Sequence, residues 1–589
     1  PMGTRDLGSD RDLRATVGIE LSFGQMGVGF SATGLRDETG KNHALGGQTM
    51  VRVSGLGPAS VIGPSDHIER VELSGTIGVR ELTGLVARLR AIAHDHTAKA
   101  VVVTFDGASA GWATLQELRD ELLAVRRAGK KVFAYMVSGT GRDYFVASAA
   151  DKIYIDPAGG LRLVGMAGTT IYFRGVFDQL GVLPQFEKIA EYKSAPEQFT
   201  ETGPTAIAAQ MRNELYDSLW DRWVSTVAEA RQLSKEAVTA LVDGGPYSAG
   251  DLAVDTKLVD AVAGPDRVSQ LVTSEIGAIL PVTSPAIERP ERWQRPAVAV
   301  IYVDGDITDG KSRAVPMLGQ TLAGGETLIE ALIAARNDPR IGAIVLRIDS
   351  PGGSALASEL ISREVFATRG VKPILCSMSD LAASGGYFVA AGCDAIFAEP
   401  MTITGSIGIF YGKFDIGGLA HKLGITTDTF KRGKRADLES MFRPYTDDER
   451  AVLKDKLRYM YGRFVSAVAE GRAITKDEVD AIGRGHVWSG TQALPIKLVD
   501  KFGGLGDVLD EAKRRMGLSG STKIQLVELP AVPSTLLGEL GKLFGAQAEA
   551  ALSLTDLPVI RDLLRGVPAS VLVAPGVPHT RLPFDIVWE

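Results

Sequence analysis

The chain contains one long internal repeat, and this repeat constrains the fold more than any other feature. The segment Tyr144-Phe-Val-Ala147 recurs as Tyr387-Phe-Val-Ala390, an offset of 243 positions. Further along, Lys257-Leu-Val-Asp260 recurs as Lys497-Leu-Val-Asp500, an offset of 240 positions. Solenoid repeats have periods of about 20–50 residues, so anchors this far apart indicate a duplicated domain.

Each copy shows strands alternating with helices. Largely apolar runs at residues 100–105 and 341–348 are typical of strands that are buried on both faces of a parallel sheet. Apolar residues at helical spacing follow in both copies, at residues 114–127 and 355–368. This alternation predicts βαβ units. We therefore expect an α/β fold with largely parallel sheets covered by helices.

The repeat also sets the expected domain boundaries. We expect the first copy at residues 67–280, the second at 296–515, and a linker at 281–295. Near the start of the copies, Leu73-Ser-Gly75 matches Val303-Asp-Gly305 with an offset of 230 instead of 243 positions. The second copy therefore carries 13 extra residues, around residues 309–322.

Two terminal segments lie outside the repeat. In residues 1–66, alternating apolar and small residues predict a β-hairpin that turns near Gly24. This β-rich extension is an ordinary hairpin or a fragment of a larger domain, although strands of outer-membrane proteins show similar alternation. Residues 516–589 contain leucines at helical spacing, from Leu536 to Leu543, followed by a Pro-rich tail. This amphipathic helix would pack on the body or bind a membrane surface or a partner.

Composition excludes several classes of protein. A net charge of −7 argues against nucleic acid as the main partner, and two cysteines cannot form a disulfide framework. Seven histidines leave little for a metal site. The chain has no apolar run of about 18 residues, so no segment reads as a membrane-spanning helix. Because residue 1 is Pro, we expect a processed chain or a fragment whose anchor or signal lies upstream.

The second copy carries two glycine motifs that could support chemistry. Asp349-Ser-Pro-Gly-Gly353 follows a predicted strand, and its paired glycines would let backbone N–H groups approach an oxyanion. In Ala382-Ala-Ser-Gly-Gly-Tyr387, Ser384 resembles a nucleophile on a strand-to-helix turn. The N–H of Gly385 would then lie at a helix N-terminus, where negative charge is favoured. Taken alone, either motif could be a glycine turn in a tightly packed domain.

A nucleophilic serine needs a base. Histidine is the usual base, but the chain has no histidine beside either motif. A lysine can act instead if burial or nearby positive charge leaves it neutral. Without such an environment lysine is a poor base, since its free pKa is about 10.4.

Comparison of the two copies points to a particular lysine. At the 243-residue offset, Ser384 corresponds to Gly141, and Lys193 corresponds to Ala436. The first copy thus has the lysine without the serine, and the second copy has the serine without a lysine at the matching position. This pattern favours a Ser–Lys dyad shared between the copies. The alternatives are that Lys193 is a solvated surface lysine, or that Lys434 is the base. We prefer Lys193.

The motifs together resemble those of bacterial signal peptide peptidase A, also called protease IV, in its long duplicated form. The resemblance is carried by Tyr192-Lys-Ser194, Asp349-Ser-Pro-Gly-Gly353, Ala382-Ala-Ser-Gly-Gly-Tyr387 and Thr404-Gly-Ser-Ile-Gly408, in that order. It covers about residues 67–515.

The resemblance implies a role for each site residue. Ser384 would be the nucleophile, Lys193 the general base, and Ser406 the hydrogen-bond partner of the lysine amine. The oxyanion donors would be Gly353 and Gly385. The resemblance implies neither a metal nor a cofactor.

The resemblance also implies a fold, an activity and a location. Each copy would be a Clp protease/crotonase-like domain. The chain would be a serine endopeptidase that cleaves signal peptide remnants and prefers small or apolar side chains. It would form a homo-oligomer, a tetramer in the long form, at the periplasmic (extracytoplasmic) face of the cytoplasmic membrane in the bacterial cell envelope. Membrane association would come from a segment absent from this chain.

Two other classes of function stay open at the level of sequence. A crotonase-like acyl-CoA enzyme could use the same fold and oxyanion geometry, because a fold does not fix a function. It would need a CoA site and catalytic carboxylates, and would not need the complementary Ser384 and Lys193. In a non-catalytic scaffold, the repeat would only build an oligomer.

Overall fold

The computed structural model describes residues 13–23, 26–36, 41–53, 65–253, 256–277, 280–283, 296–315, 320–530 and 579–581. The chain divides into two compact units. The first comprises Pro1–Asp66 and Pro285–Arg295, and the second comprises His67–Ser284 and Pro296–Glu589. Both copies of the repeat belong to the second unit, so they form one body.

The first unit contains a three-stranded antiparallel sheet made of β1 (Leu13–Phe23), β2 (Met26–Arg36) and β3 (Asn42–Val53). The predicted hairpin is confirmed, because β1 and β2 pair continuously from Leu13–Arg36 to Phe23–Met26. Its turn lies outside the described residues. The sequence did not predict β3, in which Gly46 and Gly47 interrupt the alternation.

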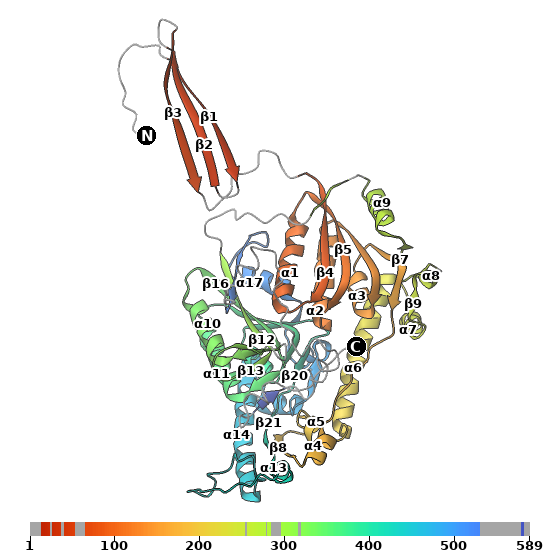
Figure 1. The fold of residues 1–589 in the computed structure, drawn as a ribbon, viewed down its shortest axis with the longest axis vertical. Coiled ribbons are helices and arrows are strands. Elements are labelled where there is room, and N and C mark those ends of the chain that lie inside the picture. The colour runs from red at the N-terminus through yellow and green to blue at the C-terminus, as the bar shows by residue number, and fades with distance from the viewer. Residues whose placement is uncertain are drawn as a thin grey trace. The chain divides into compact units, whose positions relative to one another are not determined.

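The first copy is built on a largely parallel sheet with the strand order β10-β7-β6-β5-β4-β11 (Figure 1). Its strands are β4 (His67–Thr76), β5 (Ala98–Ser109), β6 (Lys131–Thr140), β7 (Lys152–Arg162), β9 (Tyr247–Ser248), β10 (Ala261–Val262) and β11 (Val282–Thr283). Its helices are α1 (Val79–His94), α2 (Trp112–Arg127), α3 (Gly141–Ala147), α4 (Arg174–Leu180), α5 (Glu197–Thr200), α6 (Ala206–Arg231), α7 (Lys235–Asp243), α8 (Ala249–Leu252) and α9 (Pro265–Ile276).

The second copy repeats this plan with the strand order β22-β20-β18-β16-β12-β24. Its strands are β12 (Ala297–Asp304), β16 (Ile341–Ser350), β18 (Ile374–Ala383), β19 (Ala395–Ala398), β20 (Ile403–Gly405), β22 (Val487–Ser489), β23 (Lys501–Phe502) and β24 (Gln525–Leu529). Its helices are α10 (Gly325–Asn337), α11 (Ala355–Thr368), α12 (Gly385–Ala390), α13 (Gly417–Lys422), α14 (Asp447–Arg472), α15 (Lys476–Ile482), α16 (Gly490–Ala493) and α17 (Leu505–Arg515).

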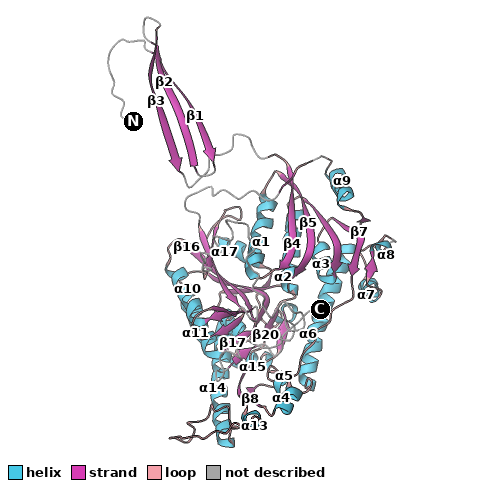
Figure 2. Ribbon diagram, in the orientation of Figure 1, coloured by secondary structure: helices cyan, strands magenta, loops and turns pink. Residues whose placement is uncertain are grey.

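Helices lie beside the sheets in both copies (Figure 2), and the long helices each bury an apolar stripe. In α1 the stripe contains Leu82, Val86 and Leu89, which are at most 1% exposed and spaced at helical intervals. Thr446 caps α14 in a reciprocal capping box with Glu449. The fold is therefore α/β with a tandem duplication and largely parallel sheets, as the sequence predicts.

The duplication extends to single hydrogen bonds. The bounds of α6 and α14 are 241 positions apart at both ends. The hydroxyl of Tyr144 donates to the carbonyl of Leu258 at 2.8 Å, and that of Tyr387 donates to the carbonyl of Leu498 at 2.9 Å. Both tyrosines are fully buried, so each bond fixes the same loop on the same short helix.

A third sheet combines both copies. It contains β8 (Leu183–Ile189), β13 (Asp306–Thr308), β14 (Arg313–Val315), β15 (Gln320–Gly324), β17 (Gly352–Ser354), β21 (Ile409–Asp415) and β25 (His579–Arg581). The strand order is β14-β15-β13-β17-β25-β21-β8. The antiparallel pair β14–β15 lies in the predicted 13-residue insertion.

Two strands next to the expected boundaries belong to the sheets of the two copies. Val282–Thr283, placed in the linker by sequence, forms β11 and pairs with β4 of the first sheet. Gln525–Leu529, placed in the C-terminal extension, forms β24 and pairs with β12 of the second sheet. Strands of two to five residues are too short to show periodicity. The helix expected around Leu536 lies outside the described residues.

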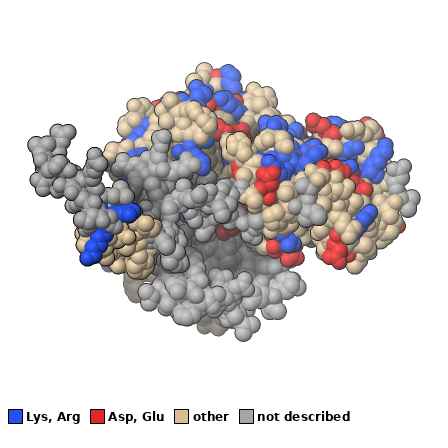
Figure 3. Space-filling model, turned by 90° about the horizontal axis from the view of Figure 1, so that it is seen from above, with Lys and Arg blue, Asp and Glu red and all other residues tan. Residues whose placement is uncertain are grey.

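The described surface carries both signs of charge. Figure 3 shows Lys and Arg side chains interspersed with Asp and Glu over the described parts of one face. The two cysteines, Cys376 and Cys393, are free and buried. None of the helices in the described ranges combines the length and apolar character needed to cross a membrane.

Candidate active site

Ser384 lies between the end of β18 and the start of α12. Its backbone φ is +55°, an unusual value for a residue other than glycine. Its N–H donates to the carbonyl of Gly405 at 2.7 Å, and its own carbonyl accepts from Phe388 N–H at 2.8 Å. A side chain at Gly386 could not fit, because a Cβ there would lie 2.8 Å from the carbonyl oxygen of Ser350. The strand-to-helix turn that the sequence predicts is therefore present.

The structure brings Lys193 and Ser406 to Ser384. The Lys193 Nζ lies 2.7 Å from Ser384 Oγ, 2.9 Å from Ser406 Oγ and 3.3 Å from the Ser406 carbonyl oxygen. All three residues are 0% exposed. Lys193 follows β8 of the first copy, while the two serines belong to the second copy. One chain thus supplies the whole cluster.

A segment that the sequence did not single out fixes Lys193 from the other side. Tyr192 N–H donates to the carbonyl of Arg484 at 3.0 Å. Gly485 has a φ of +81°, and a Cβ there would lie 2.5 Å from Lys193 N. Ser406 N–H donates to the carbonyl of His486 at 2.7 Å. In the sequence, the only hint of this contact is the pair of glycines in Gly483-Arg-Gly485. Such a pair does not by itself show which residues the segment touches.

Gly353 and Gly385 lie on the two elements next to Ser384. Gly353, on β17, has a φ of +149°, and a Cβ there would lie 2.0 Å from the Ile307 carbonyl oxygen. Only glycine fits this approach of β17 to β13. Gly385 is the first residue of α12, where a helix has no internal acceptor for its backbone N–H. Since β17 packs against α12, both candidate oxyanion donors belong to the same corner of the molecule.

Buried contacts with the first copy support the strand that ends at Ser384. The Asp380 carboxylate accepts from Thr114 N–H at 2.9 Å and from its hydroxyl at 2.6 Å. Arg347 and Glu117 form an ion pair at 2.8 Å, with side chains 0% and 2% exposed. Arg347 also donates to Ser379 on β18, at 3.1 Å. These contacts hold α2 against the strand that ends one residue before Ser384.

Electrostatics near the glycine motif favour an uncharged carboxyl group. Burial, and then the neighbouring charge of Asp380, raise the pKa of Asp349 well above its usual value. Leu381 N–H donates to Asp349 Oδ1 at 2.9 Å and keeps the group in place. Asp349 thus anchors the segment that leads into Gly353 to the end of β18.

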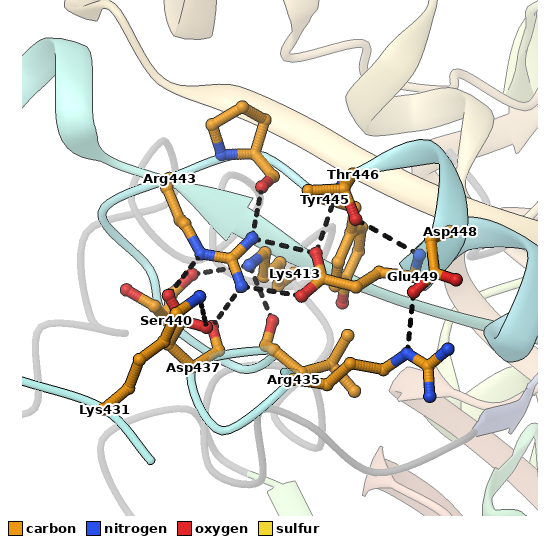
Figure 4. Close-up of polar contacts among 12 residues, drawn as sticks. Lys413, Lys431, Arg435, Asp437, Ser440, Arg443, Tyr445, Thr446, Asp448 and Glu449 are labelled. Atoms are coloured by element: carbon orange, nitrogen blue, oxygen red, sulfur yellow. Dashed lines mark hydrogen bonds and ion pairs between the residues drawn. The ribbon is translucent and has the colours of Figure 1, made fainter. Parts of the chain in front are cut away.

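Lys434, the rival base in the sequence analysis, lies elsewhere. Its side chain is 73% exposed and its Nζ lies 3.0 Å from Asp448, whereas Ser384 is fully buried. The surrounding loop is held by an ion-pair cluster (Figure 4). Arg443 pairs there with Asp437 and Glu449, in each case at 2.7 Å. Where the first copy has Lys193, the second copy thus has a loop that is held by ion pairs.

No group of three or more His, Cys, Asp or Glu side chains within the described ranges is arranged to hold a metal ion.

The profile of the family described as Peptidase family S49 matches residues 124–277 and 367–519. The two matches start 243 positions apart, as the repeat requires, and together they cover more than half of the chain. The chain belongs to peptidase family S49. The resemblance predicted from the motifs is confirmed, and the chain is a serine peptidase of this family.

Two named relatives match most of the chain, and a third matches about one third of it. "Protease 4" of Salmonella typhi is 30% identical over 81% of this chain and 76% of that protein. "Serine protease SPPA, chloroplastic" of Arabidopsis thaliana is 30% identical over 76% of this chain and 67% of that protein. "Putative signal peptide peptidase SppA" of Enterococcus faecium is 33% identical over 34% of this chain and 58% of that protein.

Proposed function

We propose that this serine peptidase is an endopeptidase that uses a Ser–Lys dyad, with Lys193 as general base for Ser384. The observation that carries the proposal is the buried 2.7 Å contact between Lys193 Nζ and Ser384 Oγ. A general base must lie within hydrogen-bond reach of the proton that it removes. Burial disfavours the charged form of a lysine, and the neutral amine is the form that accepts a proton.

In the first half of the reaction, Ser384 Oγ attacks the carbonyl carbon of a peptide bond while its proton passes to Lys193 Nζ. The backbone N–H groups of Gly353 and Gly385 stabilise the oxyanion that forms, and such a donor contributes about 3 kcal/mol in serine peptidases. The carbon–nitrogen bond then breaks, and Lys193 returns the proton to the leaving amine. The product is an acyl ester on Ser384.

In the second half, a water molecule attacks the ester carbonyl and Lys193 takes a proton from it. The ester bond breaks, and the proton returns to Ser384 Oγ as the carboxylic product leaves. The Ser406 hydroxyl, 2.9 Å from Lys193 Nζ, orients the amine in both halves. Neither half needs a metal or a cofactor.

The substrate class follows from the resemblance and from the small residues around the nucleophile. We propose signal peptide remnants with small or apolar side chains as substrates. Ala383 and Gly385 flank Ser384, so little side-chain volume stands next to the attacking oxygen. The name of the Enterococcus faecium relative points to the same substrate. Cleavage of an apolar signal peptide should exceed that of a charged peptide of equal length; equal rates would contradict this assignment.

The proposed site of action is the extracytoplasmic face of the cytoplasmic membrane in a bacterial cell envelope. The chain would work there as a homo-oligomer, a tetramer in the long form. Sedimentation of the purified chain and fractionation of cells that make the protein test these two points. A monomer at working concentration, or a protein confined to the cytoplasm, would contradict them.

A serine-directed fluorophosphonate probe tests the dyad directly. Labelling should occur on Ser384 and should fall strongly in Lys193→Ala, because the serine loses its base. Lys434→Ala is the matched control and should label normally, since Lys434 is exposed and paired with Asp448. Equal labelling of Lys193→Ala and the unmodified chain would refute the role of Lys193.

A further inference from the structure

The side chain of His486 lies in a stack of aromatic rings next to the segment that carries Lys193. The centroid of its ring lies 4.7 Å from that of Tyr192 and 3.8 Å from that of Trp488. Tyr192 directly precedes Lys193 and belongs to the first copy, whereas His486 and Trp488 belong to the second copy. The imidazole thus joins the two copies beside the proposed base.

The backbone of His486 makes a second contact with the same cluster. Its carbonyl accepts the N–H of Ser406 at 2.7 Å, and the Ser406 hydroxyl lies 2.9 Å from Lys193 Nζ. His486 is only 8% exposed, so its neighbours fix both the ring and the carbonyl. This one residue therefore reaches the amine from two sides, through the ring of Tyr192 and through the backbone of Ser406.

The imidazole acts by packing rather than by charge. His486 Nδ1 lies 2.9 Å from the carbonyl oxygen of Val487, and Nε2 lies 3.5 Å from the Glu214 carboxylate on α6 of the first copy. Burial lowers the pKa of His486 below its usual value of 6.5, and the nearby carboxylate only partly opposes this effect. The ring is therefore uncharged at neutral pH, and stacking with its aromatic neighbours is its main interaction.

Comparison of the two copies shows that this ring is present only where the serine and the lysine meet. The short helices α8 and α16 begin at matching capping boxes, which sets an offset of 241 positions in this region. His486 then corresponds to Gly245, where a Cβ would lie 1.9 Å from the carbonyl oxygen of Leu163. Leu163 is the counterpart of Ser406 at the 243-residue offset. The first copy, which has no serine nucleophile, thus has neither the imidazole nor the hydroxyl that would orient a lysine.

We propose that His486 is a positioning residue for the general base, Lys193. Its ring holds Tyr192, the neighbour of the lysine, and its carbonyl holds Ser406, the hydrogen-bond partner of the amine. This inference rests on the proposed Ser–Lys dyad and adds a residue that acts through the lysine. Catalytic groups work only when packing fixes the residues that support them.

Two substitutions at His486 test whether its ring positions the base. His486→Ala removes the ring and retains the backbone bonds, whereas His486→Phe keeps an aromatic ring in the stack. We expect kcat of His486→Ala to fall about 100-fold with little change in KM, because the amine is displaced and no substrate contact is removed. His486→Phe should keep most of the activity. His421→Ala is the matched control and should be fully active, since His421 is exposed on α13.

The pH–rate profile separates positioning from a simple loss of stability. The limb on which activity rises with pH reports the loss of a proton from the base. In His486→Ala this limb should move to higher pH, toward the free lysine value of about 10.4, because the amine is less enclosed. A smaller amount of folded protein would lower the whole profile and leave the limb in place.

Two substitutions at Tyr192 approach the stack from the first copy, and they carry the test if His486→Ala does not fold. Tyr192→Ala should reproduce both effects, whereas Tyr192→Phe keeps the ring and should resemble the parent. Normal kcat in His486→Ala, or an equal loss in His486→Phe, would overturn the positioning role. Lys193→Ala is measured in the same assay. If it alone is inactive, only the positioning role is rejected, whereas normal activity in Lys193→Ala rejects the dyad itself.

Discussion

At the scale of single residues, the site depends on glycines as much as on the groups that react. The backbone at Gly485 lies so close to that of Lys193 that a Cβ at Gly485 would be 2.5 Å from Lys193 N. Ser384 and Ser406 themselves have φ values of +55° and +51°. Strained backbone of this kind persists where surrounding structure fixes it, and it is concentrated at functional sites.

Gly485→Ala should therefore damage catalysis through Lys193. The new Cβ would lie 2.5 Å from Lys193 N, and a φ of +81° is unfavourable for alanine. Displacement of a catalytic group by about 1 Å can cost about 100-fold in rate, so we expect kcat to fall by about that factor. Steady-state kinetics measure the loss, and circular dichroism checks that the chain is folded.

Gly84→Ala is the matched control, because Gly84 lies within α1 and a Cβ there would meet nothing within 4 Å. Alanine at a helix interior is favoured over glycine by up to about 1 kcal/mol, so this variant should be at least as stable as the parent and fully active. If Gly485→Ala kept normal kcat, the positioning of Lys193 by this segment would be wrong.

At the scale of elements, ion pairs and hydrogen bonds of charged side chains hold the loop between β21 and α14 in place. Hydrogen bonds from Arg443 lower the pKa of Glu449 from 4.5 to about 2, and Lys413 Nζ donates to the carbonyls of Leu438 and Ser440. Because the pKa of Glu449 is depressed in the folded state, its contribution to stability is present above the unfolded value of 4.5. That contribution is lost as the pH falls toward 2.

Arg443→Gln should show this dependence. At pH 7 the variant should be less stable than the parent, because Glu449 and Asp437 lose their shared partner. The difference should stay constant down to about pH 4.5 and shrink between pH 4.5 and 2. Urea unfolding of both chains across this range measures it, and a difference that grows as the pH falls would contradict the assignment.

The elements of the repeat could be predicted from sequence, whereas several short strands could not. The apolar run at residues 100–105 and the helical spacing in residues 114–127 lie within β5 and α2, because each is long enough to show its period. β11, β24 and β25 have two to five residues and exist through pairing with distant strands. Ser384 and Lys193 could be picked out because a comparison of the two copies shows each of them in one copy only. The same comparison did not single out the segment around Gly485.

At the scale of the whole molecule, the two copies behave as one compact unit rather than as two domains on a linker. The sequence could not show that the copies form one unit, because contacts between the copies leave no periodic pattern in the sequence. Among the described residues, Arg347 has the largest fully buried side chain, and its partner Glu117 comes from the other copy. Glu117 also accepts from Leu505 N–H at 2.7 Å, so the pair connects three elements.

Glu117→Ala should destabilise this unit strongly. Removal of one partner leaves a buried guanidinium without its carboxylate, which typically costs about 3–5 kcal/mol in the free energy of unfolding. Replacement of both partners by apolar residues, in E117L/R347M, should recover much of the loss. Chemical denaturation measures both variants.

Asp455→Ala provides the control for an exposed pair. Asp455 and Arg458 are 75% and 65% exposed, and such pairs contribute about 0–1 kcal/mol. If Glu117→Ala cost no more than Asp455→Ala, the pair between the copies would not hold the unit together.

The central claim is that Ser384 and Lys193 act as one catalytic unit across the two copies. A double-mutant cycle of kcat/KM on Ser384→Ala, Lys193→Ala and the combined variant tests it most directly. Residues that act as a unit are strongly non-additive, so the combined variant should lose hardly more activity than either single variant. Independent, additive losses would contradict the dyad, and so would near-normal activity in either single variant.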